Sequence, residues 1–253
     1  MSAAYDSYDY TTYWENRQYE HNSEIIAIKS FLSKIPKIKT ILDIGAGFGR
    51  LTSTYLYRGE NIVITDPSAK LLKLAREKYH QNKVRFIQTK LENIPGKIRN
   101  KSVDLIILVR VLHHLKDCDE SINIINKLLK EDGHLIIEFA NKSHFKATLS
   151  EFFKGNFTFP IDIFPKDIRS KKNKKKKTLP FVNYHPDDIV KKLEENGFEI
   201  VEKRSVSNIR SAFFKNLLSM DILLAIESFL QHPLSRINFG PSIFILANKK
   251  RVV

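Results

Sequence analysis

Cysteine, glycine and long apolar runs are all scarce in this chain of 253 residues. It has one cysteine, Cys118, so an internal disulfide is excluded and a reducing compartment, the cytoplasm, is expected. No stretch approaches the roughly 18 uncharged apolar residues that would span a bilayer, and the N-terminus lacks the basic flank and apolar run of a secretory signal. A chain of this length can still bury a sizeable hydrophobic core.

Acidic residues are also few in comparison with basic ones. The 28 Asp and Glu residues are outnumbered by 42 Lys and Arg residues, which gives a net charge of +14. Such a surface suits a nucleic acid, an anionic lipid surface or an acidic substrate, although the lysines are spread along the chain. The one dense run, residues 171–177, is interrupted only by Asn173. We interpret it as a solvated flexible loop, with a phosphate-contacting patch as the alternative.

Short apolar runs and amphipathic stretches alternate through the first half of the sequence. The runs predict strands at residues 40–44, 61–65, 84–88, 103–109 and 134–139, and the stretches between them predict helices at 50–57, 68–80 and 121–129. Strands that alternate with helices form right-handed crossovers and a mainly parallel sheet. Because the strands are nearly continuous apolar runs, helices are expected on both faces. The predicted fold class is therefore a doubly wound α/β sheet.

The pattern loosens at both ends of this region. A helix is predicted at residues 23–32, after a tyrosine-rich start, and we assign residues 1–35 to a helical lid segment. An aromatic and lysine-rich stretch follows residue 141, and then come a helix at 186–196, a strand at 198–206, a helical stretch at 211–231 and a last strand at 242–247. Residues 36–253 are interpreted as one catalytic domain with insertions at about 142–182 and 209–238.

The sharpest motif is a glycine-rich turn between a predicted strand and a predicted helix. Gly45, Gly47 and Gly49 follow Asp43 closely. Glycine allows the backbone to approach a ligand and to adopt positive φ. Ligands of such sheets bind at the carboxyl ends of the strands, which is where this turn lies.

Asp66 closes the next predicted strand, 21 residues after Gly45. A carboxylate here can accept hydrogen bonds from both hydroxyls of a ribose, which a nicotinamide dinucleotide and S-adenosylmethionine both contain. The glycine spacing separates the two ligands. The dinucleotide pattern G-x-G-x-x-G/A would place Arg50 at its last position, where it is too large for close packing of helix against strand. The spacing G-x-G-x-G therefore favours S-adenosylmethionine.

Several segments resemble the class I S-adenosylmethionine-dependent methyltransferases, especially the methyltransferase type 11 and ubiquinone-menaquinone methyltransferase-like group. The matching segments are residues 42–50, 65–71, 86–95, 102–115 and 128–137. The resemblance implies a Rossmann-like, seven-stranded sheet that is mostly parallel, with the last strand antiparallel. It also implies an enzyme that takes a methyl group from S-adenosylmethionine and releases S-adenosylhomocysteine.

The resemblance assigns the glycine turn to the methionine half of the cofactor. Gly45, Ala46 and Gly47 are expected beneath this half, and Val109 beside it. Asp43 is expected to anchor the cofactor's amino group, directly or through water.

The resemblance assigns the ribose and adenine of the cofactor to residues that follow the second and third strands. The resemblance implies that Asp66 and the adjacent Pro67 lie at the ribose, and that Leu91 and Glu92 flank the adenine. Lys90 departs from the family, because many relatives have an acid there that accepts a hydrogen bond from the adenine amine, and lysine has no acceptor. Glu92 or a backbone carbonyl takes that role instead, or adenine binding is weaker.

The tyrosine-rich start contains the candidates for a lid over the cofactor. Tyr13, Trp14 and Tyr19 are the best of them, and Arg17 is expected to pair with the cofactor's carboxylate. The alternative is a segment that packs on the edge of the sheet.

Candidate catalytic residues follow the fourth strand and precede a later helix. Methyl transfer from a sulfonium needs mainly alignment and a dry pocket, and a base only if the acceptor must lose a proton. His113 and His114 are each interpreted either as that base or as a packed, backbone-bonded histidine. Tyr184 and His185 either contact the substrate or serve as packing and capping residues. No metal is expected.

The acceptor is the least constrained part of the prediction. The apolar stretch at 211–231 is interpreted as core or lid packing, with an apolar acceptor pocket, a dimer face or a peripheral membrane contact as alternatives. We predict a small-molecule acceptor, lipophilic or aromatic, with an RNA or protein acceptor on the basic surface as the alternative. A binding module without catalysis is a third hypothesis, which rests on Lys90 alone. The protein is expected to be a monomer or a homodimer.

Overall fold

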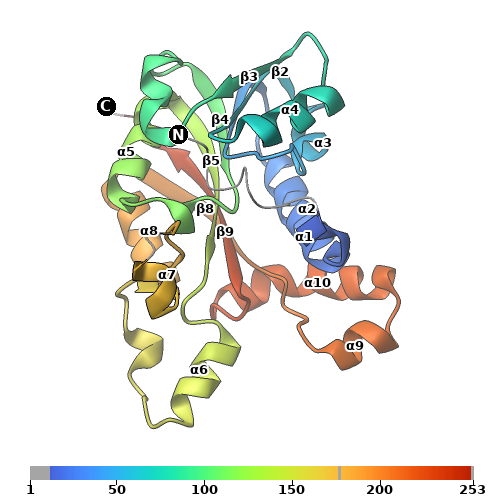
Figure 1. The fold of residues 1–253 in the computed structure, drawn as a ribbon, viewed down its shortest axis with the longest axis vertical. Helices are drawn as coiled ribbons and strands as arrows, with labels where there is room; N and C mark the ends of the chain where they lie inside the picture. Colours follow the sequence, from blue (N-terminus) through green and yellow to red (C-terminus); the bar gives the residue numbers. More distant parts are fainter. Residues whose placement is uncertain (1–11, 176–177, 252–253) are drawn as a thin grey trace.

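A seven-stranded sheet with the order β3-β2-β1-β4-β5-β9-β8 forms the centre of the structure (Figure 1). The structure is a computed structural model that describes residues 12–175 and 178–251. The strands are β1 (Ile38–Ile44), β2 (Gly59–Asp66), β3 (Val84–Gln88), β4 (Val103–Leu108), β5 (Leu129–Ala140), β8 (Phe198–Val206) and β9 (Ser242–Lys249). All neighbouring pairs are parallel except those of β9, which runs antiparallel to both β5 and β8. The predicted fold class is confirmed, including the antiparallel last strand.

Helices cover both faces of the sheet. On one face α5 (Cys118–Leu128), α8 (Pro186–Glu195) and the 3-10 helix η1 (Leu91–Gly96) bury apolar side chains such as Ile125 and Leu193. On the other face α2 (Gln18–Leu32), α3 (Thr52–Tyr55) and α4 (Ala69–Lys78) bury Phe31, Tyr55 and Leu72. The remaining short helices in this part of the chain are α1 (Thr12–Glu15) and the 3-10 helix η2 (Leu112–His114).

Side-chain caps set the start of the helices that follow the strands. Ser68 accepts a hydrogen bond from the Leu71 backbone N–H (3.2 Å) at the start of α4, and Asp117 accepts one from Glu120 N–H (3.0 Å) at the start of α5. These bonds satisfy backbone donors that have no partner within the helix. They fix where the chain turns from strand to helix along the edge at which the site lies.

Some predicted bounds were wrong. The helix predicted at 50–57 is a single turn, Thr52–Tyr55, because glycine and β-branched residues around it are poor helix formers. β5 begins at Leu129 rather than at 134, since Leu129 pairs with Val103 and an irregularity in register separates this pair from the rest of the strand.

Two insertions extend the sheet domain. The first contains α6 (Phe145–Phe152), the 3-10 helix η3 (Phe159–Ile161), β6 (Lys166–Asp167), α7 (Lys171–Lys175) and β7 (Val182–Asn183), and the second contains α9 (Ala212–Leu217) and α10 (Met220–Ser235). The helix predicted at 211–231 is thus two helices, because Leu218 and Ser219 are extended and Ser219 caps α10. Within the described residues, no helix has the length and hydrophobicity needed to cross a membrane.

The lysine run is helical where it is described. Residues 171–175 form α7, and all five side chains are exposed, rather than part of the predicted flexible loop. Lys176 and Lys177 lie outside the described residues, as do the tyrosines at positions 5, 8 and 10 of the predicted lid segment.

Candidate active site

A cavity of about 380 Å³ lies at the carboxyl ends of β1, β2 and β4. The turn after β1 contributes its floor, and the segments after β2, β3 and β4 contribute its walls. This is the edge of the sheet at which ligands of doubly wound folds bind. Nine predicted cofactor residues line it: Asp43, Gly45, Ala46, Gly47, Asp66, Pro67, Leu91, Glu92 and Val109.

The floor of the cavity requires glycine. Gly45, Gly47 and Gly49 have φ values of +71°, +58° and +74°, which other residues adopt only with strain. A Cβ on Gly45 would overlap the Cγ2 of Val111. The N–H groups of Gly45 and Ala46 both donate to the carbonyl oxygen of Thr65, at 2.8 and 3.0 Å, so the turn is held against the end of β2.

Asp66 is oriented by backbone donors. One carboxylate oxygen accepts the N–H of Gly47 (2.9 Å) and the other accepts the N–H of Ser68 (2.7 Å). The side chain is buried at the junction of the glycine turn and the start of α4, on the wall of the cavity. The carboxylate is therefore held in one orientation by the fold.

Asp43 is a second buried acid on the same wall. Burial raises the pKa of Asp43 to about 7, and the negative charge of Asp66 acts in the same direction. A hydrogen bond from the Tyr55 hydroxyl opposes this rise. A buried carboxyl group of this kind becomes charged most readily when a cation lies beside it, which fits the ammonium group of an amino-acid ligand.

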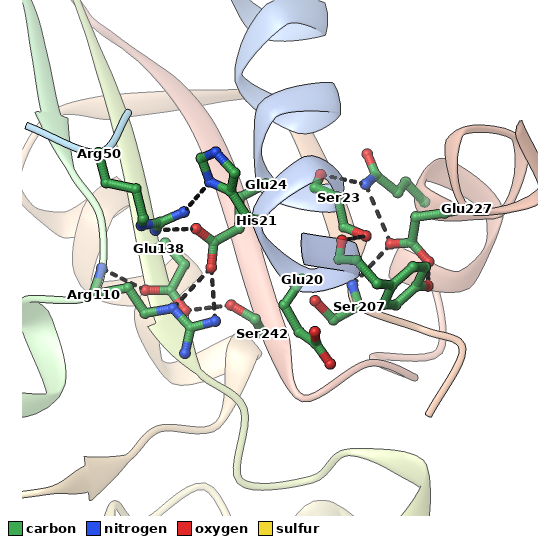
Figure 2. A network of polar contacts seen from close by, with 12 residues as sticks. Glu20, His21, Ser23, Glu24, Arg50, Arg110, Glu138, Ser207, Glu227 and Ser242 are labelled. Carbon is green, nitrogen blue, oxygen red and sulfur yellow. Dashed lines mark hydrogen bonds and ion pairs between the residues drawn. The ribbon is translucent and has the colours of Figure 1, made fainter. Parts of the chain in front are cut away.

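Two arginines on the cavity wall converge on one buried acid (Figure 2). Arg110 lies 2.7 Å from Glu24, and Arg50 forms an ion pair with the other carboxylate oxygen of Glu24. Burial opposes ionisation of Glu24, but the charges of Arg110 and Arg50 outweigh it and lower its pKa. Arg50 also contacts the ring nitrogen of His21 at 2.6 Å and lies 3.5 Å over the ring of Trp14.

The backbone at Arg110 is held in an unusual conformation. Its φ is +63°, and its N–H donates to the buried carboxylate of Glu138 at 2.7 Å. Burial raises the pKa of Glu138, and the hydroxyl of Ser242 donates to its other oxygen. Residues of β5 and β9 thus hold the backbone of the turn after β4. This conformation directs the side chain of Arg110 toward Glu24.

Three of the predicted lid residues lie together, because the rings of Tyr13 and Trp14 are 5.4 Å apart and Arg17 lies 4.2 Å from the ring of Tyr13. Arg17 is exposed and does not line the cavity. Its neighbour Trp14 is buried against Arg50, and the hydroxyl of Tyr19 donates to Glu227 of α10 at 2.6 Å. Arg50 and Arg110 line the cavity together with Lys90 and Lys116, and the sequence prediction assigned neither arginine to the site. The available signal was that Arg50 follows the last glycine of the turn and that Arg110 lies two residues after β4.

Of the catalytic candidates, His114 alone lines the cavity. Its Nδ1 lies 2.7 Å from the carbonyl oxygen of Pro180, and burial lowers its pKa. His113 is buried against the ring of Phe181, with ring centroids 4.6 Å apart, and burial lowers its pKa well below the usual value. Because His113 packs there, its ring does not line the cavity.

Tyr184 and His185 have structural positions. Tyr184 is buried in the core and forms a β-bridge with Asn141, and burial raises its pKa. His185 caps α8 by accepting the N–H of Asp187 (3.2 Å), and its other nitrogen donates to the carbonyl of Pro160 (2.9 Å). Neither side chain lines the cavity, because that of Tyr184 packs in the core and that of His185 bonds to Pro160 of the first insertion.

Comparisons with known proteins agree with this geometry. Residues 42–137 match the family described as a methyltransferase domain. The chain is 26% identical over 178 residues to a ubiquinone/menaquinone biosynthesis C-methyltransferase of Pseudoalteromonas translucida, over 66% of this chain and 69% of the relative. It is 27% identical over 203 residues to a ubiquinone biosynthesis O-methyltransferase of Pelagibacter ubique, over 75% and 80%. A tRNA 5-carboxymethoxyuridine methyltransferase of Escherichia coli is 26% identical over 68% of this chain and 64% of its own length.

Solved structures share the fold. A magnesium protoporphyrin IX methyltransferase from Synechocystis with bound S-adenosylhomocysteine superposes with a TM-score of 0.60 at 18% identity, over 98% of this chain and 91% of the other. Fold, site and family match make this protein a class I S-adenosylmethionine-dependent methyltransferase. Within that class, its relatives by sequence include the ubiquinone and menaquinone methyltransferases, and its cofactor is S-adenosylmethionine.

Proposed function

We propose that the protein methylates a small lipophilic or aromatic molecule. The observation that supports this acceptor class is the apolar part of the cavity lining. Phe48, Leu51, Leu115, Leu179 and Pro180 line the cavity in addition to the predicted cofactor residues. An apolar wall binds a greasy or flat acceptor by burial and excludes water from the reacting atoms.

The cofactor contacts belong to the same proposal. Asp66 would hold the ribose hydroxyls, Asp43 the amino group, and Glu92 the adenine amine in place of Lys90. Arg50 would face the carboxylate of the cofactor, in the role first expected of Arg17. The glycine turn fits the group because a side chain at Gly45 would collide with Val111. S-adenosylmethionine supplies, when bound, a methyl group activated by the sulfonium.

His114 is the proposed general base, for acceptors that lose a proton. A carbonyl oxygen only accepts hydrogen bonds, so the contact with Pro180 places the proton of His114 on Nδ1. The lone pair is then on Nε2, as a base requires. Because burial lowers the pKa of His114, the ring stays neutral at physiological pH.

Calorimetry on Asp66→Ala tests the cofactor site. Loss of a charged acceptor should weaken binding of S-adenosylhomocysteine by about 10- to 100-fold. Glu60→Ala is the matched control, because Glu60 is an exposed acid at the opposite end of the same strand, and it should bind normally. Equal affinity of Asp66→Ala and wild type would remove the ribose assignment.

A screen with labelled methyl donor tests the acceptor class. Purified protein incubated with cell extract should label a compound that partitions into organic solvent. Label in RNA or in protein would instead support the second candidate, which is favoured by the net charge of +14 and by the tRNA-modifying relative. For an RNA acceptor, neutralising Lys174 and Lys175 should flatten the salt dependence of RNA binding by about one unit of slope for each lysine that had bound a phosphate.

A further inference from the structure

Exposed apolar side chains are concentrated in the two insertions. In the described part of the chain, 19 large apolar side chains are exposed, and 16 of them lie within residues 142–182 and 209–238. Eight are phenylalanines and eight are leucines or isoleucines: Phe145, Leu149, Phe152, Phe153, Phe157, Ile161, Ile163, Phe164, Ile168, Leu179, Phe213, Phe214, Leu217, Ile222, Phe229 and Ile237. We refer to these residues as the insertion surface. Single exposed apolar residues are ordinary, but a set of this size marks an interaction site.

Three of the four buried residues of helix α10 are polar, and large apolar side chains of the helix are exposed. Its buried residues, spaced four apart, are Leu223, Glu227, Gln231 and Ser235. Its most exposed apolar residues are Phe229, at 78%, and Ile222, at 49%. A surface helix normally buries the apolar side instead.

The inward-facing polar residues of α10 hold the helix in its orientation. Glu227 accepts a hydrogen bond from the N–H of Ser207 at 2.8 Å (Figure 2). It also accepts one from the Tyr19 hydroxyl (2.6 Å) and one from the N–H of Asn208 (3.0 Å). Gln231 donates to the carbonyl oxygen of Ser23 at 2.8 Å. These bonds attach α10 to α2 and to the end of β8, so the helix cannot rotate to bury its phenylalanine without losing them.

The helices α6 and α9 show the same outward orientation. Neither has a buried residue. On α6, Phe145, Leu149 and Phe152 are spaced as one helical stripe and are exposed by 52%, 41% and 53%. In α9, Phe213 and Leu217 are exposed by 68% and 64%. Apolar stripes that face away from the core are available to an external apolar partner.

The two insertions lie at the same end of the molecule. Figure 1 shows α6 and α9 projecting below the sheet. Their bases are joined, because the N–H of Phe145 donates to the carbonyl oxygen of Phe239 (2.9 Å) and the two rings stack with centroids 5.0 Å apart. Leu179 belongs to the insertion surface and also lines the cavity. The cavity therefore opens beside this surface.

Cationic side chains accompany the apolar ones. Residues 145–175 contain eight lysines and arginines against three acids. The exposed lysines of α7 are part of this set. Apolar side chains interleaved with cations match the chemistry of an anionic lipid bilayer, which offers acyl chains below a layer of negative headgroups.

Two other occupants fit less well. Single-stranded RNA binds exposed aromatic rings by stacking, but half of the insertion surface is aliphatic and offers no ring. A second copy of the chain would bring two positively charged segments together, and lysine is depleted from the centres of protein interfaces. Charge and side-chain type therefore favour lipid.

We propose that the two insertions dock this protein on anionic lipid membranes, with the phenylalanines of α6, α9 and α10 at the headgroup boundary and the lysines of the first insertion above them. This surface is independent of the methyl-transfer proposal. It requires neither cofactor nor acceptor, so vesicles alone can test it.

Vesicle co-sedimentation is the experiment. The protein should bind phosphatidylcholine vesicles that contain phosphatidylglycerol, and bind pure phosphatidylcholine vesicles more weakly. Combined replacement of Phe152, Phe153, Phe213 and Phe214 by serine should reduce partitioning by more than about tenfold. Lys171→Gln and Lys172→Gln should each weaken binding to the anionic vesicles by about fivefold. Tyr57→Ser with Leu74→Ser is the matched control, because both are exposed outside the insertions, and it should bind like wild type.

Circular dichroism establishes that each variant is folded. The proposal is overturned if folded wild-type protein stays in the supernatant with anionic vesicles, or if the phenylalanine variant binds them as well as wild type does. Light scattering tests whether a second copy of the chain occupies the surface. If wild-type protein is a dimer and the phenylalanine variant is a monomer, the surface is assigned to self-association. RNA retention that the same variant loses, without any vesicle binding, would assign it to nucleic acid.

Discussion

The ionisation of Asp43 should make the affinity for the cofactor depend on pH. With a pKa of about 7, this buried carboxyl group is largely protonated at pH 6 and largely ionised at pH 8. Only the ionised form pairs with an ammonium group, so affinity for S-adenosylhomocysteine is expected above pH 7 and lost as the pH falls. The loss should approach about tenfold per pH unit below the pKa. Calorimetry between about pH 5.5 and 7.5, in buffers of different ionisation enthalpy, measures both the affinity and the released proton.

Tyr55→Phe moves this midpoint in a defined direction. The hydroxyl of Tyr55 donates to Asp43 and lowers its pKa, so removing it should shift the pH at which affinity declines upward. Asp43→Asn, which cannot titrate, should bind weakly at every pH. A pH profile that is the same in wild type and Asp43→Asn would contradict the assignment of the amino group to this residue.

Gly45→Ala should separate backbone strain from steric overlap. The new methyl group would meet Val111 in a backbone conformation at φ +71°, and we expect a loss of about 2–4 kcal/mol in unfolding free energy together with loss of cofactor binding. Gly155→Ala has the same strain at φ +80° in open space and should cost about 1 kcal/mol. Gly96→Ala has neither problem and should be nearly neutral. Urea denaturation compares the three, and equal losses at Gly45 and Gly155 would show that the overlap with Val111 is relieved.

The sequence predicts cavity-lining residues well where the backbone itself forms the cavity. Gly45, Gly47 and Asp66 occupy positions that strand ends impose, so their spacing carries the information. Arg50 lines the cavity and Arg17 does not, which spacing alone does not reveal, because long side chains reach distant partners. Arg50 is directed by Glu24 and Trp14, which come from a different part of the chain.

At the scale of elements, Tyr19 joins the N-terminal helix to the second insertion. Its hydroxyl donates to Glu227 and accepts the N–H of Ile209 (3.0 Å). Tyr19→Phe leaves both of these buried groups without that partner, and we expect a loss of about 1–3 kcal/mol in unfolding free energy, measured by urea denaturation. Tyr57→Phe, at an exposed tyrosine, should lose nothing. A neutral Tyr19→Phe would show that α10 is held by its other contacts.

Strands were predicted more accurately than helices. The bounds of β3 and β8 match their predictions. The stretch at 211–231 has apolar residues throughout, so its pattern does not show the break at Ser219. Nor does it show which side faces inward, because Glu227 is buried by hydrogen bonds formed with distant residues.

For the whole molecule, cofactor binding should be visible as thermal stabilisation. S-adenosylhomocysteine at about 100 times its Kd contributes about 2.7 kcal/mol, which for a chain of this size corresponds to a rise of about 5–10 °C in Tm. Asp66→Ala, which should bind about 10- to 100-fold more weakly, should show about half of that rise or less at the same ligand concentration, and Glu60→Ala the full rise. A full shift in Asp66→Ala, measured by differential scanning fluorimetry, would locate the ligand elsewhere.

The position of β9 in the sheet has a consequence for how the chain folds during its synthesis. This strand comes last in chain order, yet it lies between β5 and β8 and is buried along nearly its whole length. While the ribosome is still adding residues up to 249, β5 has an open apolar edge and β8 has no neighbour in the sheet. From the completion of β5 at residue 140 until β9 is synthesised, the nascent chain thus exposes an apolar strand edge that can pair with other chains.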